Sequence, residues 1–128
     1  MKLNIGVLFG SRTCEHDVSV ISGLQAAQAL GEYVGKRLGA RITLSKRIPI
    51  RAGLGGGSAD CAAALIALNR LWGLRLPVDK LLEIGRALGA DVPYCIAGGF
   101  ARVRGMGEKI GALGTGERFP LVIVHVGR

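Results

Sequence analysis

The sequence of 128 residues predicts an α+β fold, in which helices pack on a mixed β-sheet. Three observations carry this prediction. Apolar residues alternate along residues 41–50, a period of two that is typical of a strand. Strong helical patterns follow over residues 59–72 and 78–88. Helical and strand-like stretches alternate irregularly, which favours an α+β or mixed arrangement over a regular strand–helix repeat.

In the first part of the chain, residues 3–9 are apolar and are expected to form a strand that ends at Gly10. A polar loop over residues 10–16 leads into an expected helix from Asp17 to Leu38. Its apolar residues recur at multiples of three and four: Val18, Ile21, Leu30, Val34 and Leu38. Residues 41–50 form the next expected strand. Its inward face is Ile42, Leu44, Ile48 and Ile50.

In the second part, a glycine-rich loop precedes the expected helix of residues 59–72, for which Gly73 is a natural stop. Pro77 is expected to open the helix of residues 78–88, and Gly89 to end it. The remaining expected strands, separated by glycine-rich turns, are residues 94–96, 100–104 and 121–126.

The composition limits the class of protein. Hydrophobic residues make up 49% and charged residues 20%, as in globular domains. No apolar run approaches the ~20 residues that span a bilayer, and residues 1–10 lack the features of a signal peptide, so we expect a cytoplasmic protein without a membrane partner. The cysteines, Cys14, Cys61 and Cys95, have no CxxC spacing and predict neither a disulfide framework nor a zinc site.

The net charge of +8 favours anionic partners. The basic residues are scattered, with few aromatic residues between them, which argues against a nucleic-acid surface. We therefore expect most of these charges to be solvated.

The glycine loop, residues 53–58, is the strongest chemical feature of the sequence. Its four glycines allow a sharp turn and expose several N–H groups on one side. The start of the following helix adds unpaired amides and the positive end of the helix dipole, so the loop can bind phosphate. Ser58 can donate its hydroxyl to a phosphate or bind a metal. The loop fits neither the Walker A motif nor GxGxxG, and the alternative interpretation is a flexible turn before a helix.

The glycine loop and its flanks resemble the second motif of the GHMP kinases. The matching residues are Pro49, Ile50, Arg51, Ala52, Gly53, Leu54, Gly55, Gly56, Gly57, Ser58, Ala59 and Asp60. The similarity continues through residues 63–65, 68–74, 88–93, 98–101 and 105–108, so that it covers about residues 32–128. Within this family the sequence is most similar to the kinases of the non-mevalonate isoprenoid pathway that phosphorylate 4-diphosphocytidyl-2-C-methyl-D-erythritol.

The resemblance implies an ATP-dependent kinase of a small-molecule alcohol, which uses ATP and Mg²⁺; it leaves the oligomeric state open. The residues from Pro49 to Ala59 would wrap the ATP phosphates. Asp91 matches the catalytic aspartate, which acts on the hydroxyl that attacks the γ-phosphorus. Without the resemblance, the alternative interpretation of Asp91 is a turn residue between Gly89 and Pro93.

Some parts of the family pattern are not evident. These are the strand that bears the catalytic lysine, the Gly-Tyr-His segment and the carboxyl-terminal domain with a third glycine-rich motif. The resemblance therefore implies a truncated kinase, with a partial GHMP amino-terminal domain over residues 31–128. Lys2, in Lys2-Leu3-Asn4-Ile5, is a candidate for the catalytic lysine, against the alternative of a solvated terminal lysine.

Residues 1–30 resemble a different family, the D-alanine–D-alanine ligases. The similarity lies in Gly6-Val7-Leu8-Phe9-Gly10 and in Glu15-His16-Asp17-Val18-Ser19. It implies a Rossmann-like βα unit in which Glu15 and Ser19 contact an amino-acid substrate. We therefore expect a chimera with a junction near residues 29–32. It would be an active kinase, an inactive chimera that binds only nucleotide or phosphate, or a ligase fragment.

Overall fold

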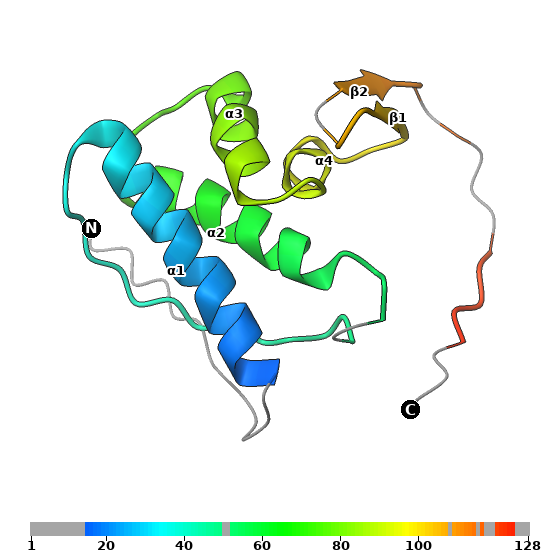
Figure 1. Ribbon diagram of the computed structural model, residues 1–128, viewed down its shortest axis with the longest axis horizontal. Helices are drawn as coiled ribbons and strands as arrows, with labels where there is room; N and C mark the ends of the chain where they lie inside the picture. The colour runs from blue at the N-terminus through cyan, green and yellow to red at the C-terminus, as the bar shows by residue number, and fades with distance from the viewer. Residues whose placement is uncertain (1–14, 50–51, 108, 115, 117–119, 125–128) are drawn as a thin grey trace.

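The computed structural model describes residues 15–49, 52–107, 109–114, 116 and 120–124 (Figure 1). In this part of the chain the helices are α1 (Glu15–Val34), α2 (Gly56–Leu71), α3 (Val78–Leu88) and α4 (Val92–Ala97). The strands are β1 (Ala101–Arg104) and β2 (Lys109–Ala112). Helices and strands thus occupy successive parts of the chain, and the predicted α+β class is confirmed. The strand expected at residues 3–9 lies outside the described residues.

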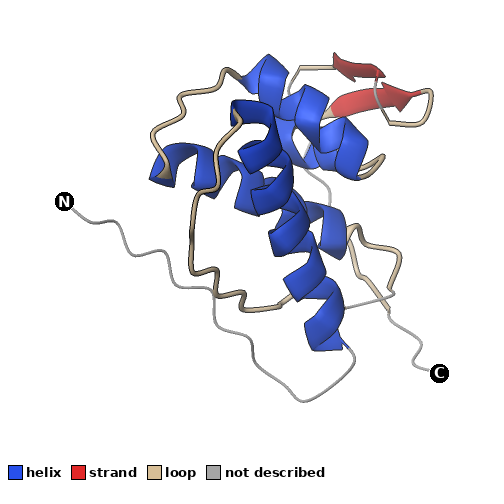
Figure 2. Ribbon diagram, turned by 60° about the vertical axis from the view of Figure 1, so that its left-hand side comes forward, coloured by secondary structure: helices blue, strands red, loops and turns tan. Residues whose placement is uncertain are grey.

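Helix α2 lies at the centre of the fold, and α1, α3 and α4 all pack against it (Figures 1 and 2). Leu30 of α1 and Leu65 of α2 are completely buried in the common core. Full burial of such a side chain contributes about 1.5–3 kcal/mol. The rest of the core is small and apolar: Ala26, Cys61, Ala62, Ala64, Leu68, Leu81, Ile84 and Val92. None of the described helices has the length and apolar character needed to cross a bilayer.

Helix α1 ends at Val34, and its predicted extension to Leu38 is wrong. Gly35 adopts a left-handed φ of 65°, and the amide of Lys36 donates to the carbonyl of Gly31 at 2.9 Å, so the helix closes in a Schellman motif. Ile21, one of the recurring apolar residues that predicted this helix, lies in α1 but has an exposed side chain. The helix is continuous through residues 29–32, where a junction was expected; the division into residues 1–30 and 31–128 stays a prediction.

The predicted helices α2 and α3 are confirmed. Gly73 stops α2 with a φ of 61°, and the amide of Leu74 donates to the carbonyl of Asn69 at 3.0 Å. Helix α3 has the predicted bounds, with Pro77 before its first residue. Helix α2, however, begins at Gly56 and not at Ala59, so the last glycines of the loop belong to its first turn.

The strand predicted at residues 94–96 is wrong, because these residues lie in α4. Pro93 occupies the first turn of this helix, where its fixed φ is favourable and its missing N–H costs no hydrogen bond. A short apolar run fits a buried helical turn as well as it fits a strand.

The sheet among the described residues is a two-stranded antiparallel hairpin of β1 and β2. Ala101 pairs with Ala112 at its base, and Arg104 pairs with Lys109 beside the turn. Strand β1 confirms the prediction for residues 100–104, whereas β2, with the sequence Lys-Ile-Gly-Ala, carries little strand signal and was not predicted. The larger mixed sheet that we expected is not formed by the described residues.

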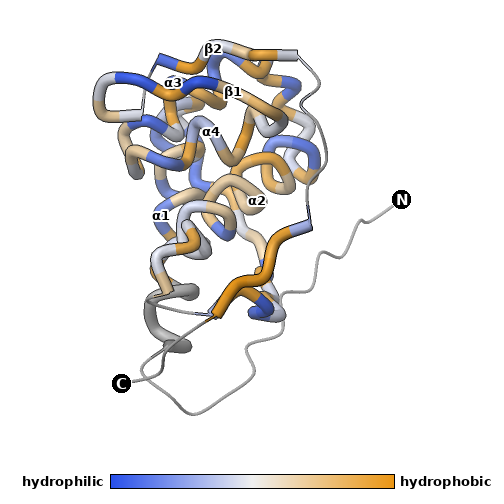
Figure 3. Tube along the Cα trace, turned by 90° about the vertical axis from the view of Figure 1, so that its right-hand side faces the viewer, coloured by the Kyte–Doolittle hydropathy of each residue, from blue (hydrophilic) through white to orange (hydrophobic). Residues whose placement is uncertain are grey.

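Two other predicted strands take no ladder partner among the described residues. Residues 41–49 run along α2 with alternating burial: Leu44, Lys46 and Ile48 are half-buried, and the residues between them are exposed. Leu121, Val122, Ile123 and Val124 are all more than two-thirds exposed, and Figure 3 shows them as an apolar stretch outside the helices. The alternation at residues 41–49 was therefore predicted correctly, but a strand also requires a neighbouring backbone.

Candidate functional site

The glycine loop reverses the chain between residues 41–49 and α2. Gly53 and Gly55 adopt φ values of 71° and 66°, a left-handed conformation that side chains disfavour. Gly55 is the N-cap of α2, and its carbonyl accepts the first helical hydrogen bond from the amide of Ala59 at 2.9 Å. The predicted loop geometry is therefore present, and two of its four glycines are required by the backbone conformation.

The N-terminus of α2 is uncapped. No side chain hydrogen-bonds to its first amides, and its first turn contains no acidic residue. The amides of Gly56, Gly57 and Ser58 have no intrahelical acceptor because they are the first in the helix. An anion at this position would satisfy these donors and interact favourably with the helix dipole.

Lys46 adds a cation to this region, and sequence reasoning missed it. Its ammonium forms an ion pair with the carboxylate of Asp60, and the two side chains are only 19% and 12% exposed. A Cβ atom on Gly56 would lie 2.8 Å from the Nζ atom of Lys46, so the ammonium lies against the first residue of α2. A signal existed in the sequence, since Lys46 shares the inward face of the alternating stretch with Leu44 and Ile48.

Asp91, the candidate catalytic residue, is the N-cap of α4. Its backbone carbonyl accepts from the amide of Cys95 at 3.0 Å, whereas its side chain does not cap the helix. The residue is exposed, but Val92 and Pro93, which follow it, are buried. A solvent-accessible carboxylate on a firmly packed backbone suits a group that must meet a substrate hydroxyl.

Two thiols, Cys61 on α2 and Cys95 on α4, lie close enough to interact electrostatically. Cys61 lies in the second turn of α2, and Cys95 lies one turn after Asp91 in α4. Burial, Asp60 and Cys95 together raise the pKa of Cys61 to about 11. Burial and then Asp91 raise the pKa of Cys95. Helix α4, which follows Asp91, packs on α2, which follows the glycine loop. Both thiols stay protonated at neutral pH.

A narrow apolar groove runs between residues 40–44 and α2. It has a volume of about 150 Å³, with Ala63, Ala67 and Leu71 among the α2 residues in its wall, and it reaches Asp60 at one end. Pockets that enclose a drug-sized ligand have volumes of about 300–1,000 Å³, so this groove can hold only part of a nucleotide. A larger hollow of about 940 Å³, along residues 24–39, lies away from the glycine loop.

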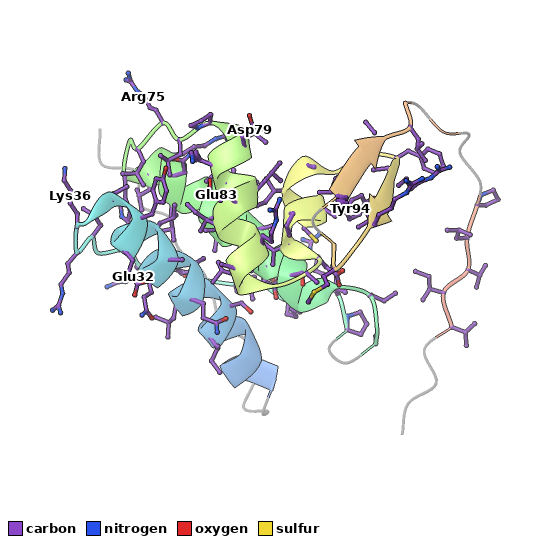
Figure 4. All side chains as sticks on the ribbon, turned by 45° about the horizontal axis from the view of Figure 1, so that its top comes forward. Glu32, Lys36, Arg75, Asp79, Glu83 and Tyr94 are labelled. Atoms are coloured by element: carbon purple, nitrogen blue, oxygen red, sulfur yellow. The ribbon has the colours of Figure 1, made fainter. Side chains whose placement is uncertain are left out.

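Many surface charges lie apart from this region. Figure 4 shows Glu32, Lys36, Arg75, Asp79 and Glu83 on the α1 and α3 side, away from the hairpin and Tyr94. Their exposure fits the expectation that most charges of this basic chain are solvated.

Several predicted site residues are not placed. Lys2, Ile50 and Arg51 lie outside the described residues, and so do the side chains of Glu15 and Ser19, whose backbones belong to α1. In the described ranges, no group of three His, Cys, Asp or Glu side chains could hold a metal ion.

Comparison with protein families places most of the helical core in one family. The model of the GHMP kinases N terminal domain matches residues 20–99. This match includes the glycine loop and the Asp91 turn.

Individual proteins agree with this match. The 4-diphosphocytidyl-2-C-methyl-D-erythritol kinase of Enterococcus faecalis is 51% identical over 100 residues, 78% of this chain and 35% of that protein. Its counterpart in Carboxydothermus hydrogenoformans is 54% identical over 86 residues, 67% of this chain and 30% of that protein. The counterpart in Bifidobacterium longum is 40% identical over 123 residues, 96% of this chain and 38% of that protein. The chain thus spans about a third of the length of these relatives.

A solved structure is similar as well. The crystal structure of 4-(cytidine 5'-diphospho)-2C-methyl-D-erythritol kinase superposes with a TM-score of 0.61 at 35% sequence identity. The match covers 88% of this chain and 40% of that one.

Proposed function

Since the chain belongs to the GHMP kinase family, whose amino-terminal domain it matches, we propose that it is part of an ATP-dependent kinase for 4-diphosphocytidyl-2-C-methyl-D-erythritol. The substrate is the one named for the relatives. The observation that supports this most directly is the left-handed glycine loop followed by the uncapped helix α2, on which α4, the helix that follows Asp91, packs.

In this proposal the segment from Pro49 to Ala59 wraps the ATP phosphates. The amides of Gly56, Gly57 and Ser58 donate to phosphate oxygens, and the ammonium of Lys46 lies close enough to lower the local negative charge. Lys2 remains the candidate for a second, catalytic lysine.

Mg²⁺ would be held mainly by the phosphates and water, because it usually keeps several waters and binds phosphate oxygens with only one or two protein ligands. The hydroxyl of Ser58 is the group in the loop that would hold it. When bound, the ion neutralises phosphate charge during transfer.

Asp91 orients the acceptor hydroxyl and takes its proton. The hydroxyl oxygen then forms a bond to the γ-phosphorus, the bond between this phosphorus and the β–γ bridging oxygen breaks, and ADP leaves. Such a positioned base contributes a factor of about 10² to 10⁴ to the rate.

The experiment is a transfer assay with radiolabelled ATP and the cytidine-diphosphate-linked alcohol. We expect Asp91→Asn to reduce the rate at least 100-fold, and Asp79→Asn, an exposed aspartate on α3, to leave it unchanged. Equal rates for Asp91→Asn and the unmutated chain would contradict the role of Asp91. No transfer by the unmutated chain would instead leave the alternative of nucleotide binding without turnover.

Calorimetry with ATP tests the binding site separately. Gly56→Val puts a branched side chain onto Lys46 and Ile48 and should abolish binding. Gly39→Val is the control, because Gly39, like Gly56, has no left-handed φ, but a Cβ atom there would meet no other atom within 4 Å. Unchanged affinity in Gly56→Val would show that the glycine loop is not the site.

A further inference from the structure

The turn between β1 and β2 lies directly against the backbone that carries Asp91. At Gly107, a Cβ atom would lie 1.9 Å from the carbonyl oxygen of Ala90 and 2.7 Å from its carbonyl carbon. That carbon belongs to the peptide bond between Ala90 and Asp91. Gly107 is buried, although its neighbour Met106 is 85% exposed, and its φ is 107°. No residue with a side chain can occupy this position without displacing the turn or the peptide.

Helix α3 contacts the residue that follows Asp91. Val92 is 2% exposed and packs onto Gly85, where a Cβ atom would lie 3.0 Å from its Cγ1 atom. The amide of Val92 donates to the carbonyl of Gly89 at 3.2 Å. The hairpin turn therefore contacts the residue before Asp91, and α3 contacts the residue after it.

The hairpin is attached to the Asp91 region at both ends. At its tip, Gly107 contacts Ala90; at its base, the hydroxyl of Tyr94 donates to the carbonyl of Gly99 at 2.7 Å. Figure 4 shows Tyr94 beside the hairpin, and Figure 2 shows the hairpin next to the helices.

The hairpin contributes little to the core. Val103 and Met106 are exposed, and the cross-strand pair Arg104–Lys109 places two cations opposite each other, which is unfavourable. An isolated two-stranded hairpin is only marginally stable. Core packing therefore does not explain the close contact at Ala90. The contact instead constrains the backbone of the next residue, Asp91.

We propose that the β1–β2 turn is a positioning device for Asp91, and that Gly107 is the residue that makes its close contact possible. The turn fixes the Ala90–Asp91 peptide from the hairpin side and so fixes the direction in which the carboxylate leaves the backbone. The inference rests on the proposed function, because positioning affects a rate only if Asp91 serves the acceptor hydroxyl.

The test compares Gly107→Ala with Gly114→Ala. Both changes place alanine at a left-handed φ, but only the first meets other atoms within 4 Å. We expect Gly107→Ala to lower kcat at least tenfold with the KM for ATP within twofold, and Gly114→Ala to leave both within twofold. Equal effects of the two substitutions on kcat would overturn the inference.

A second comparison separates positioning from general loosening. In an Asp91→Asn background, Gly107→Ala should lower kcat no further, because the group that it positions is already gone. A further tenfold loss in that background would show a merely structural effect. Tyr94→Phe releases the hairpin base without adding atoms and should lower kcat about threefold at an unchanged KM for ATP; an unchanged kcat would contradict the inference even if Gly107→Ala does not fold.

An amide NMR spectrum tests the contact without any activity. Gly107→Ala should shift the amide signals of Asp91 and Val92, and Gly114→Ala should not. If the unmutated chain transfers no phosphoryl group, the proposed function fails, while these shifts still report on the contact between the β1–β2 turn and the Ala90–Asp91 peptide. If the two signals do not move in Gly107→Ala, the positioning of Asp91 by this turn is refuted.

Discussion

The ion pair between Lys46 and Asp60 should stabilise the glycine loop measurably. The Lys46 and Asp60 side chains are 19% and 12% exposed. Their burial is therefore intermediate between that of a surface ion pair, worth about 0–1 kcal/mol, and that of a buried ion pair, whose disruption costs about 3–5 kcal/mol. We therefore expect Lys46→Met and Asp60→Asn each to lower the free energy of unfolding by about 1–3 kcal/mol. In a double-mutant cycle their coupling should be about 1–2 kcal/mol, because each single change leaves a half-buried charge unpaired.

Urea unfolding followed by tryptophan fluorescence measures this coupling. Trp72 is the only tryptophan, and its Nε1 atom donates to the carbonyl of Gly39 at 3.0 Å, so it reports on the contact of α2 with residues 39–48. The control cycle uses Lys80 and Glu83, an exposed pair on α3 for which we expect no measurable coupling. If both cycles give the same coupling, burial does not strengthen the Lys46–Asp60 pair and the reasoning is wrong.

The same two substitutions should change ATP affinity in opposite directions. Lys46→Met leaves the Asp60 carboxylate unneutralised near the loop and should weaken binding, whereas Asp60→Asn releases the ammonium toward the phosphates and should strengthen it. One unit charge at short range in a partly solvated site changes the binding free energy by about 1 kcal/mol, or about fivefold in Kd. Calorimetry distinguishes the signs, and shifts in the same direction would refute an electrostatic origin.

Two further predictions concern buried polar groups. Asn69→Ala should lower the free energy of unfolding by about 2–3 kcal/mol, because both the amide and the carbonyl of Leu76 lose their side-chain partner. The control Gln28→Ala removes an exposed hydrogen bond and should lower it by less than about 0.5 kcal/mol. Equal urea midpoints for the two variants would contradict this prediction. For Cys61, the raised pKa keeps the thiol protonated in the folded chain while it ionises in the unfolded chain, so its contribution is complete below pH 9.0 and is lost as the pH rises toward about 11. The free energy of unfolding should fall by about 1–2 kcal/mol across this window, and a Cys61→Ala variant with the same pH dependence would refute the assignment.

The sequence predicted well the parts of the fold that depend on local chemistry. Helix α3 has the predicted bounds because Pro77 and Gly89 act on their own backbone. The left-handed glycines of the loop and the stop at Gly73 have the same local origin. The predicted family is confirmed by the match to residues 20–99, although the roles of individual site residues stay predictions.

The errors arose where a partner distant in sequence decides the structure. Residues 94–96 were predicted as a strand because their short apolar run does not reveal that α4 packs on α2 and α3. Strand β2 was missed because its place depends on pairing with β1 and not on its own side chains.

The sequence alone thus predicted the glycine loop, through the conformational preference of glycine, and the candidate Asp91, through the order of the motifs. Tertiary structure decided the packing of α4, the helix that follows Asp91, on α2, the pairing of Lys46 with Asp60, and the contact of Gly107 with Ala90. Lys46 and Asp60 lie 14 positions apart, and Ala90 and Gly107 lie 17 positions apart, so these contacts depend on how the elements pack, which no local pattern specifies.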